Sequence, residues 1–161
     1  AASLATVMAS YGLWVPLEEL RIACGVTRDG SKASNVLKAA RAYGFSAKGF
    51  KKEPQDLTSL PMPSIIHWNF NHYVVFEGFK GGRALLNDPA SGPRMVSMLE
   101  FEQSYTGVVL AFEPTQEFEP RGRAPSIVSA LRARLENSEV AARKSTRLNS
   151  SHITTSYAVF C

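Results

Sequence analysis

The sequence has few cysteines, no long apolar run and no cluster of metal-ligating side chains. Its two cysteines, Cys24 and Cys161, are too few for a disulfide framework and fit a reducing compartment. No run approaches the roughly 18 apolar residues that a membrane helix needs, and no stretch is expected to be a secretory signal peptide. His67 and His72 are expected on opposite faces of a strand-like stretch, so they predict no metal site.

Basic residues are not in excess where the chain is expected to fold. Residues 1–120 contain 11 Lys and Arg against 12 Asp and Glu. The net charge of +4 arises after them, because residues 121–143 hold five basic and two acidic residues, and residues 144–161 hold two basic and no acidic residues. The folded part therefore carries no basic stripe, which argues against a nucleic-acid partner.

The 161 residues, 45% hydrophobic and 20% charged, are enough for one domain with a core. Residues 1–44 predict three helices, expected near 1–11, 16–24 and 31–43, each followed by a glycine. Ser31 is expected to cap the third helix. Leu17, Leu20 and Ile22 are expected to face inward from the second helix.

After Gly44 the pattern changes to strands. Strands are expected at 45–50, 63–68, 72–79, 83–87 and 106–112, with helical turns at 54–60 and 98–105 and a turn at 89–93. Lys80-Gly-Gly predicts a tight hairpin between the third and fourth strands. Helices followed by antiparallel strands predict an α+β domain with the helices packed on one side of a sheet.

His72 and Asp88 are expected at the same end of that hairpin, His72 where one arm begins and Asp88 where the other ends. A thiol peptidase needs a thiolate at a helix N-terminus, an imidazole to hold its proton and a carboxylate to orient the imidazole. This pair matches the last two requirements. Taken alone, the local patterns favour other roles: a histidine with a satisfied hydrogen bond, and the opener of an Asn-Asp-Pro turn.

The remaining candidates are weaker on local pattern. Cys24 precedes Gly25 at the C-terminus of a helix, where the dipole raises a thiol pKa and disfavours a nucleophile. Trp68, Phe70 and Tyr73 are expected to form core or cleft wall, and His67 is expected to be structural.

Four stretches, in order, resemble the bacteriocin-processing, double-glycine-leader cysteine peptidase domain of peptidase-containing ABC transporters, most closely the NHLM-type transporters. They are residues 1–12, 25–31, 70–75 and 86–92. The resemblance implies a papain-like fold over residues 1–119 that needs no metal or cofactor. It makes His72 the general base and acid and Asp88 its orienting partner. Trp68, Phe70 and Tyr73 become candidates for the wall of a narrow cleft that accepts a Gly-Gly pair.

The same resemblance places the nucleophile in a Cys-Gly pair directly before Ala1, with a glutamine further upstream for the oxyanion hole. The chain begins with Ala rather than Met. We therefore expect a clipped peptidase domain that is inactive as it stands. The alternative is a cysteine-free domain that binds leader peptides without cutting them. A stand-alone thiol enzyme, such as a transglutaminase-like protein, explains the basic C-terminal part less well.

Beyond residue 119 the resemblance implies a longer exporter. Residues 120–143 are expected to be a basic linker and helix toward a transmembrane domain, lying on a membrane surface or in solvent. ATP and Mg²⁺ would bind a separate ATPase domain, and the parent would be a homodimer at the cytoplasmic side of the bacterial inner membrane, while the fragment itself would be soluble. Residues 144–161 resemble sequencing-adapter read-through, so His152 and Cys161 are set aside.

Overall fold

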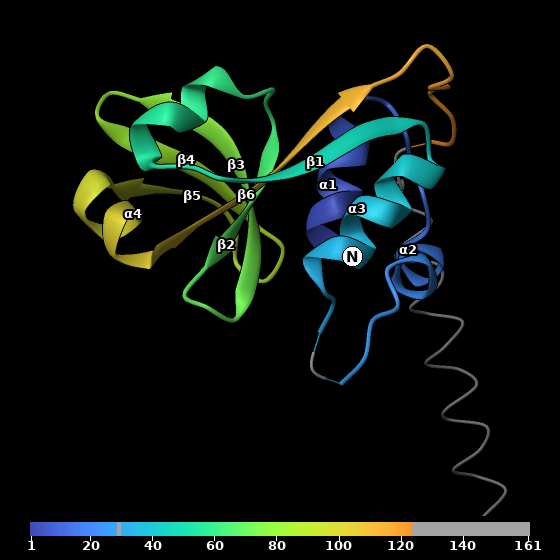
Figure 1. The fold of residues 1–161 in the computed structure, drawn as a ribbon, viewed down its shortest axis with the longest axis horizontal. Coiled ribbons are helices and arrows are strands. Elements are labelled where there is room, and N and C mark those ends of the chain that lie inside the picture. Colours follow the sequence, from blue (N-terminus) through green and yellow to red (C-terminus); the bar gives the residue numbers. More distant parts are fainter. Residues whose placement is uncertain (29, 124–161) are drawn as a thin grey trace, which may run out of the picture. The chain divides into compact units, whose positions relative to one another are not determined.

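Three helices open the computed structural model, which describes residues 1–28 and 30–123 of the chain. They are α1 (Ala2–Ser10), α2 (Leu17–Ala23) and α3 (Ala33–Ala42). Gly12, Gly25 and Gly44 follow them, as the sequence predicts. The three helices gather on one side of the sheet in Figure 1, and α4 lies at its other end.

The rest of the described chain forms one antiparallel sheet of six strands in the order β1-β6-β2-β3-β4-β5. The strands are β1 (Phe45–Lys51), β2 (Ser64–Trp68), β3 (His72–Lys80), β4 (Arg83–Asp88), β5 (Gly92–Ser97) and β6 (Tyr105–Pro114). The 3₁₀ helix η1 (Pro54–Ser59) follows β1, and α4 (Met98–Ser104) follows β5. The expected α+β architecture is confirmed.

The two faces of the sheet pack into two separate cores, because successive side chains of a strand point to opposite faces. Ile65 and Val75 join the core that the sheet makes with α1, α2 and α3. Their neighbours Ile66, Val74 and Phe76 join the second core, which α4 and η1 complete. The helical layer is thereby fixed against β2 and β3, the strands that carry the candidate histidines.

One strand was not expected. Residues 92–97 form β5, although Gly92 and Pro93 indicate a turn. Pro cannot donate a backbone hydrogen bond, so it is tolerated in a strand with a neighbour on one side only. β5 is such an edge strand, because it pairs with β4 alone.

Two expectations about the second and third helices are wrong. Only Leu20 of α2 is buried, while Leu17 and Ile22 are 38% and 83% exposed. Successive residues turn by about 100° around a helix, so Ile22 points away from the face that Leu20 buries. Ser31 does not cap α3; the N-cap is Lys32, and the Ser31 hydroxyl donates to the Cys24 carbonyl at 2.9 Å.

The segment after β6 folds back over the helices. The backbone amide of Thr115 donates to Gly44, and Trp14 N–H donates to the Arg121 carbonyl at 2.8 Å. Phe118 packs against Phe45 with ring centroids 4.7 Å apart. The compact unit therefore runs to Arg123. Most of the expected linker and helix at 120–143, and the adapter-like tail at 144–161, lie outside the described residues.

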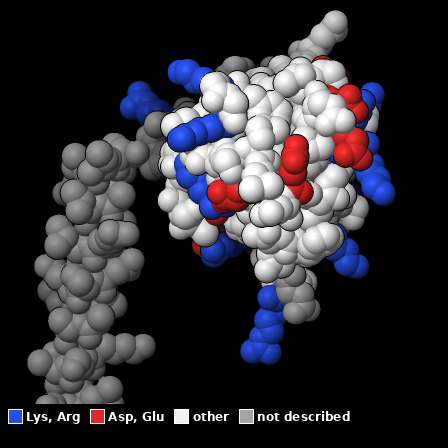
Figure 2. All heavy atoms as spheres, turned by 90° about the vertical axis from the view of Figure 1, so that its left-hand side faces the viewer, with Lys and Arg blue, Asp and Glu red and all other residues white. Residues whose placement is uncertain are grey.

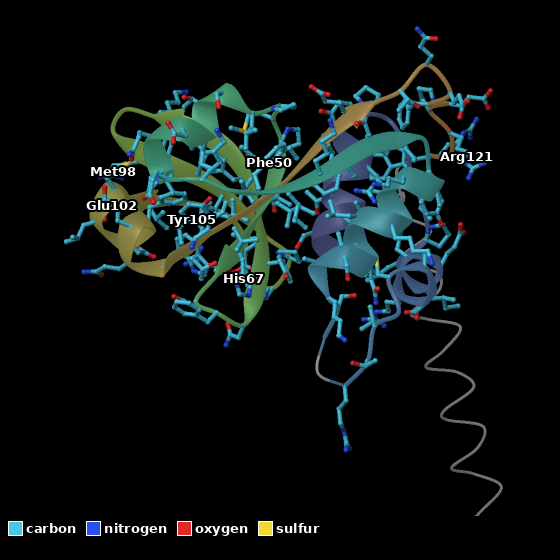
Figure 3. The ribbon with its side chains drawn as sticks, viewed as in Figure 1. Phe50, His67, Met98, Glu102, Tyr105 and Arg121 are labelled. Carbon is cyan, nitrogen blue, oxygen red and sulfur yellow. The ribbon has the colours of Figure 1, made fainter. Side chains whose placement is uncertain are left out.

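The face of the unit shown in Figure 2 carries side chains of both charges, with Lys and Arg as well as Asp and Glu. Arg121 lies at the helical end of the unit, and Met98 and Glu102 of α4 lie at the opposite end (Figure 3). Within residues 1–28 and 30–123, no helix combines the length and apolarity that crossing a bilayer requires.

Candidate active site

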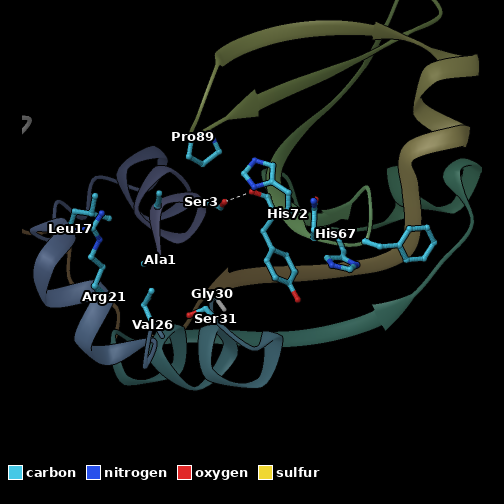
Figure 4. Close-up of a pocket in the computed structure, with 14 residues that line it drawn as sticks. Ala1, Ser3, Leu17, Arg21, Val26, Gly30, Ser31, His67, His72 and Pro89 are labelled. Carbon is cyan, nitrogen blue, oxygen red and sulfur yellow. Dashed lines mark hydrogen bonds between the residues drawn. The ribbon is translucent and has the colours of Figure 1, made fainter. Parts of the chain in front are cut away.

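A cleft of about 400 Å³ lies where the N-terminus of α1 and the α2 region face β2 and β3 (Figure 4). Backbone and side chains from both layers line it. Its lining includes Ala1, Ser3, His67, Phe70, His72 and Tyr73. The cleft therefore lies between the helical and the β parts of the unit.

His72 and Asp88 meet at the edge of this cleft. His72 is the first residue of β3 and Asp88 the last of β4, and the pairing of Val75 with Asn87 brings these ends together. Nε2 of His72 lies 2.8 Å from Oδ1 of Asp88. The juxtaposition predicted from the hairpin is therefore present in the structure.

The Asp88 carboxylate is held by further donors. Ala90 N–H donates to Oδ1 at 2.8 Å, and the Ser91 hydroxyl donates to Oδ2 at 3.0 Å. Burial alone would raise the pKa of Asp88, but the hydrogen bonds from His72, Ala90 and Ser91 outweigh it and lower the pKa to about 2. Asp88 is therefore ionised at neutral pH and acts only as an acceptor.

Because ionised Asp88 can only accept, Nε2 of neutral His72 must carry the proton. Nδ1 is then the lone-pair nitrogen, and the described residues offer it no hydrogen bond. The His72 side chain is 38% exposed, against 10% for Asp88. This geometry leaves an imidazole nitrogen free to accept a proton at the cleft.

The N-terminus of α1 is tied to the same place. The Ser3 hydroxyl, in the first turn of α1, donates to the backbone carbonyl of Tyr73 at 2.7 Å (Figure 4). Ala1, the N-cap residue, makes no side-chain cap and lines the cleft. Unpaired amides and the helix dipole make a helix N-terminus favourable for an anion such as a thiolate.

Cys24 is the only cysteine among the described residues, and it is not one of the residues that line the cleft. It is the C-cap residue of α2, is fully buried and does not line the cleft. Burial raises the pKa of its thiol. These properties agree with the expectation that Cys24 is not a nucleophile.

The three expected wall residues separate in the structure. Phe70 and Tyr73 line the cleft, whereas Trp68 is only 3% exposed and packs in the second core, 5.7 Å from Phe101 between ring centroids. Trp68 follows His67 in β2, so its side chain points to the opposite face of the sheet. The expectation that Trp68 forms part of this wall is therefore corrected.

His67 is a cleft residue that sequence reasoning missed. His67 and His72 were expected on opposite faces of one strand, but the chain reverses between them and both line the cleft. Asn69 and Phe70 make this turn with φ of 47° and 59°. The signal was the Asn-Phe-Asn turn itself, because Asn adopts positive φ more readily than most residues. Among the described residues, no group of His, Cys, Asp and Glu could hold a metal ion.

Comparisons with known proteins match most of the described chain. The model of the Peptidase C39 family matches residues 1–117. The probable microcin-H47 secretion/processing ATP-binding protein MchF of Escherichia coli is 32% identical over 117 residues, and the colicin V secretion/processing ATP-binding protein CvaB of the same species is 32% identical over 118. Each match covers 73% of this chain but only 17% of the relative, so the chain spans under a fifth of their length.

Solved structures show the same fold. A double glycine motif protease from an AMS/PCAT transporter, in complex with its leader peptide, is 58% identical, with a TM-score of 0.69 over 70% of this chain and 81% of that chain. The peptidase domain of Streptococcus ComA, at 24% identity, has a TM-score of 0.66 over 70% and 88%. The papain-like α+β fold expected from the sequence is confirmed.

Proposed function

The chain belongs to the Peptidase C39 family, and from that premise we propose that it is the leader-peptidase part of a longer, ATP-driven peptide exporter. The observation that carries the proposal is the bond between Nε2 of His72 and Oδ1 of Asp88 beside the N-terminus of α1. This is the imidazole and carboxylate half of a thiol-peptidase site.

We assign the chemistry as follows. A cysteine in a Cys-Gly pair directly before Ala1 loses its proton to Nδ1 of His72, and the thiolate attacks the carbonyl carbon of the second glycine in the Gly-Gly pair of a leader peptide. His72 then returns the proton to the leaving amine. Water, deprotonated by the same nitrogen, hydrolyses the thioester and releases the leader. Asp88 keeps the proton of the neutral ring on Nε2 and stabilises the charged ring.

The substrate is proposed from the relatives and from the shape of the cleft. The 58% identical protease is a double glycine motif protease with a bound leader peptide. Phe70 and Tyr73 supply aromatic wall to the cleft, which favours residues with small side chains at the cut. A Gly-Gly pair before the scissile bond fits such a wall.

The longer protein is proposed to contain a transmembrane domain and an ATPase domain, since the curated relatives are ATP-binding secretion and processing proteins. ATP and Mg²⁺ would bind that ATPase domain and not the peptidase. We place the peptidase on the cytoplasmic side of the bacterial inner membrane, in a homodimeric exporter.

Cleavage of a leader peptide tests the proposal. The chain is prepared with Cys-Gly before Ala1 and incubated with a Gly-Gly leader peptide, and the products are identified by mass spectrometry. We expect a single cut after Gly-Gly that is lost with His72→Ala and reduced at least 100-fold with Asp88→Asn, about the scale expected for loss of base catalysis. Equal cleavage by the wild-type sequence and His72→Ala would refute the assignment.

A second candidate function is that of a domain that binds leader peptides without cutting them. Cys24, the only thiol among the described residues, is buried and does not line the cleft, so it offers no replacement nucleophile. A domain without a nucleophile would bind the leader peptide and leave it intact. The cleavage test with the Gly-Gly leader peptide separates the two functions. If the chain with Cys-Gly before Ala1 binds the leader peptide but gives no cleavage product, the binding function is supported and the peptidase function is not.

A further inference from the structure

The imidazole of His67 is held on three sides in the wall of the cleft. Its Nδ1 lies 2.9 Å from the hydroxyl of Thr106 in β6. The ring packs against Tyr73 with centroids 5.0 Å apart, and meets Phe70 edge to face at 6.5 Å. A side chain fixed in this way presents its remaining nitrogen in one direction without further loss of rotamer freedom.

The contacts of Thr106 determine which nitrogen carries the proton. The Thr106 hydroxyl also donates to the backbone carbonyl of His67 at 3.2 Å. A hydroxyl has a single hydrogen, so while it donates to that carbonyl it must accept from Nδ1–H. The neutral ring then has its proton on Nδ1, and Nε2 is a bare acceptor.

Nothing in the described part of the chain uses that acceptor. No hydrogen bond to Nε2 is formed by the described residues, and the half-buried ring lines the same cleft as His72 and Ala1 (Figure 4). Burial lowers the pKa of His67, which keeps the ring neutral and the lone pair of Nε2 available at neutral pH.

We infer that His67 is a substrate-binding residue whose Nε2 accepts a hydrogen bond from a backbone N–H of the peptide in the cleft. The inference rests on the proposed function and adds a residue to it. His67 fixes the position of the peptide, while His72 handles the proton. Thr106 is a positioning residue that acts through the His67 tautomer and does not itself line the cleft.

The tautomer is tested first, on the 161-residue chain without any peptide. Long-range ¹H–¹⁵N correlation spectra at pH 7.5 distinguish a protonated Nδ1 from a protonated Nε2 in each histidine. We expect His67 with its proton on Nδ1 and His72 with its proton on Nε2. A proton on Nε2 of His67 overturns the inference, because that nitrogen would then be a donor.

Peptide binding is tested next, by calorimetric titration of the same chain with a Gly-Gly leader peptide. His67→Phe keeps an aromatic ring and removes the acceptor, so we expect the Kd to rise about 5-fold, the effect of one hydrogen bond. His67→Gln offers an amide oxygen in place of Nε2 and should recover part of that loss. Thr106→Val removes the hydroxyl that keeps the proton of His67 on Nδ1, so it should raise the Kd by a smaller factor than His67→Phe does.

The outcomes separate this inference from the proposed function. If the wild-type chain binds the peptide and His67→Phe binds it equally well, the role of His67 is wrong and leader binding stands. If neither binds, both are wrong for this chain. Circular dichroism of each variant shows whether it is folded. If His67→Phe is unfolded, the Kd of His67→Gln is compared with that of the wild-type chain instead, and an equal Kd would show that Nε2 of His67 does not bind the peptide.

Discussion

At the scale of single residues, the site depends on how the Asp88 carboxylate is held. Three donors converge on it, one from the His72 ring, one from the Ala90 backbone and one from the Ser91 hydroxyl. Together they outweigh burial and keep the carboxylate ionised, so that it orients His72 at any pH at which a peptidase would work.

Ser91→Ala removes one of these donors and should raise the pKa of Asp88 from about 2 toward its ordinary value. Ser91→Thr keeps the hydroxyl and is the matched control. The pKa is measured from the ¹³C shift of the Asp88 carboxyl as a function of pH. An identical titration in wild type and Ser91→Ala would show that the hydroxyl does not act on the carboxylate.

Asp88 should also make the stability of the fold depend on acid. Its pKa falls from 3.8 to about 2 on folding, so ionised Asp88 stabilises the folded chain above the unfolded value, and this contribution is lost as the pH falls toward 2. Asp88→Asn lacks it. We expect a wild-type advantage in unfolding free energy of about 2 kcal/mol at neutral pH.

Urea unfolding of wild type and Asp88→Asn at several pH values measures how the difference in their unfolding free energy depends on pH. The advantage of wild type over Asp88→Asn should shrink between about pH 4 and pH 2. A constant difference over that range would mean that the carboxylate is not stabilised by its hydrogen bonds.

At the scale of secondary-structure elements, the hydrogen bond from Ser3 to Tyr73 couples the N-terminus of α1 to the start of β3. Ser3 is only 6% exposed, and Tyr73 directly follows His72. One buried hydroxyl thus helps to set the separation between the proposed nucleophile and its base, because each lies at the end of one of these elements.

Ser3→Ala should lower the free energy of unfolding by about 1 to 2 kcal/mol, since it removes a buried hydroxyl and leaves a part-buried carbonyl without this donor. Ser10→Ala is the matched control in the same helix, because the exposed Ser10 hydroxyl donates only to Val7 within α1. Urea unfolding of both variants measures the difference. Equal losses would show that the link between α1 and β3 contributes nothing.

At the scale of the whole described unit, residues 115–123 close over the helices and connect the end of the sheet with the beginning of the chain. Gly122 makes the closest approach. A Cβ on Gly122 would lie 2.5 Å from the Trp14 carbonyl oxygen, beside the bond from Trp14 N–H to Arg121, and its φ is 87°. This segment is therefore part of the folded unit.

Gly122→Ala should displace this segment, because both the contact and the positive φ oppose a side chain. Gly82→Ala is the control, since Gly82 also has positive φ, at 71°, but nothing lies within 4 Å of its Cβ position. We expect Gly122→Ala to cost about 2 kcal/mol more than Gly82→Ala in thermal or urea unfolding. Equal costs would show that Trp14 and Gly122 are not packed together.

Across the unit, sequence reasoning succeeded where a local signal decides the structure. Lys80-Gly-Gly predicts the hairpin, and the hairpin brings His72 to Asp88. It failed where the neighbours decide. The strand β5 was not predicted because it contains Pro93, and proline is tolerated only in an edge strand. No local pattern shows that β5 lies at the edge of the sheet.

The sequence also did not show which side chains of β2 point into the cleft and which into the core, for a related reason. His67 and Trp68 are adjacent, and the alternation puts one in the cleft and the other in the core. Which is which depends on the register of β2 against β3 and β6, and therefore on residues far away in the sequence. The third helix start shows the same limit, because Ser31 donates to Cys24 instead of capping α3.

The most direct test of the proposed site is the reactivity of a thiol placed where α1 begins. Cys-Gly is added before Ala1, Cys24 and Cys161 are replaced by alanine, and the rate of alkylation by iodoacetamide is measured against pH. We expect a thiol pKa clearly below the ordinary value of about 8.5, and a rise toward that value with His72→Ala. An ordinary thiol pKa that His72→Ala leaves unchanged would contradict the assignment of this cleft as a thiol-peptidase site.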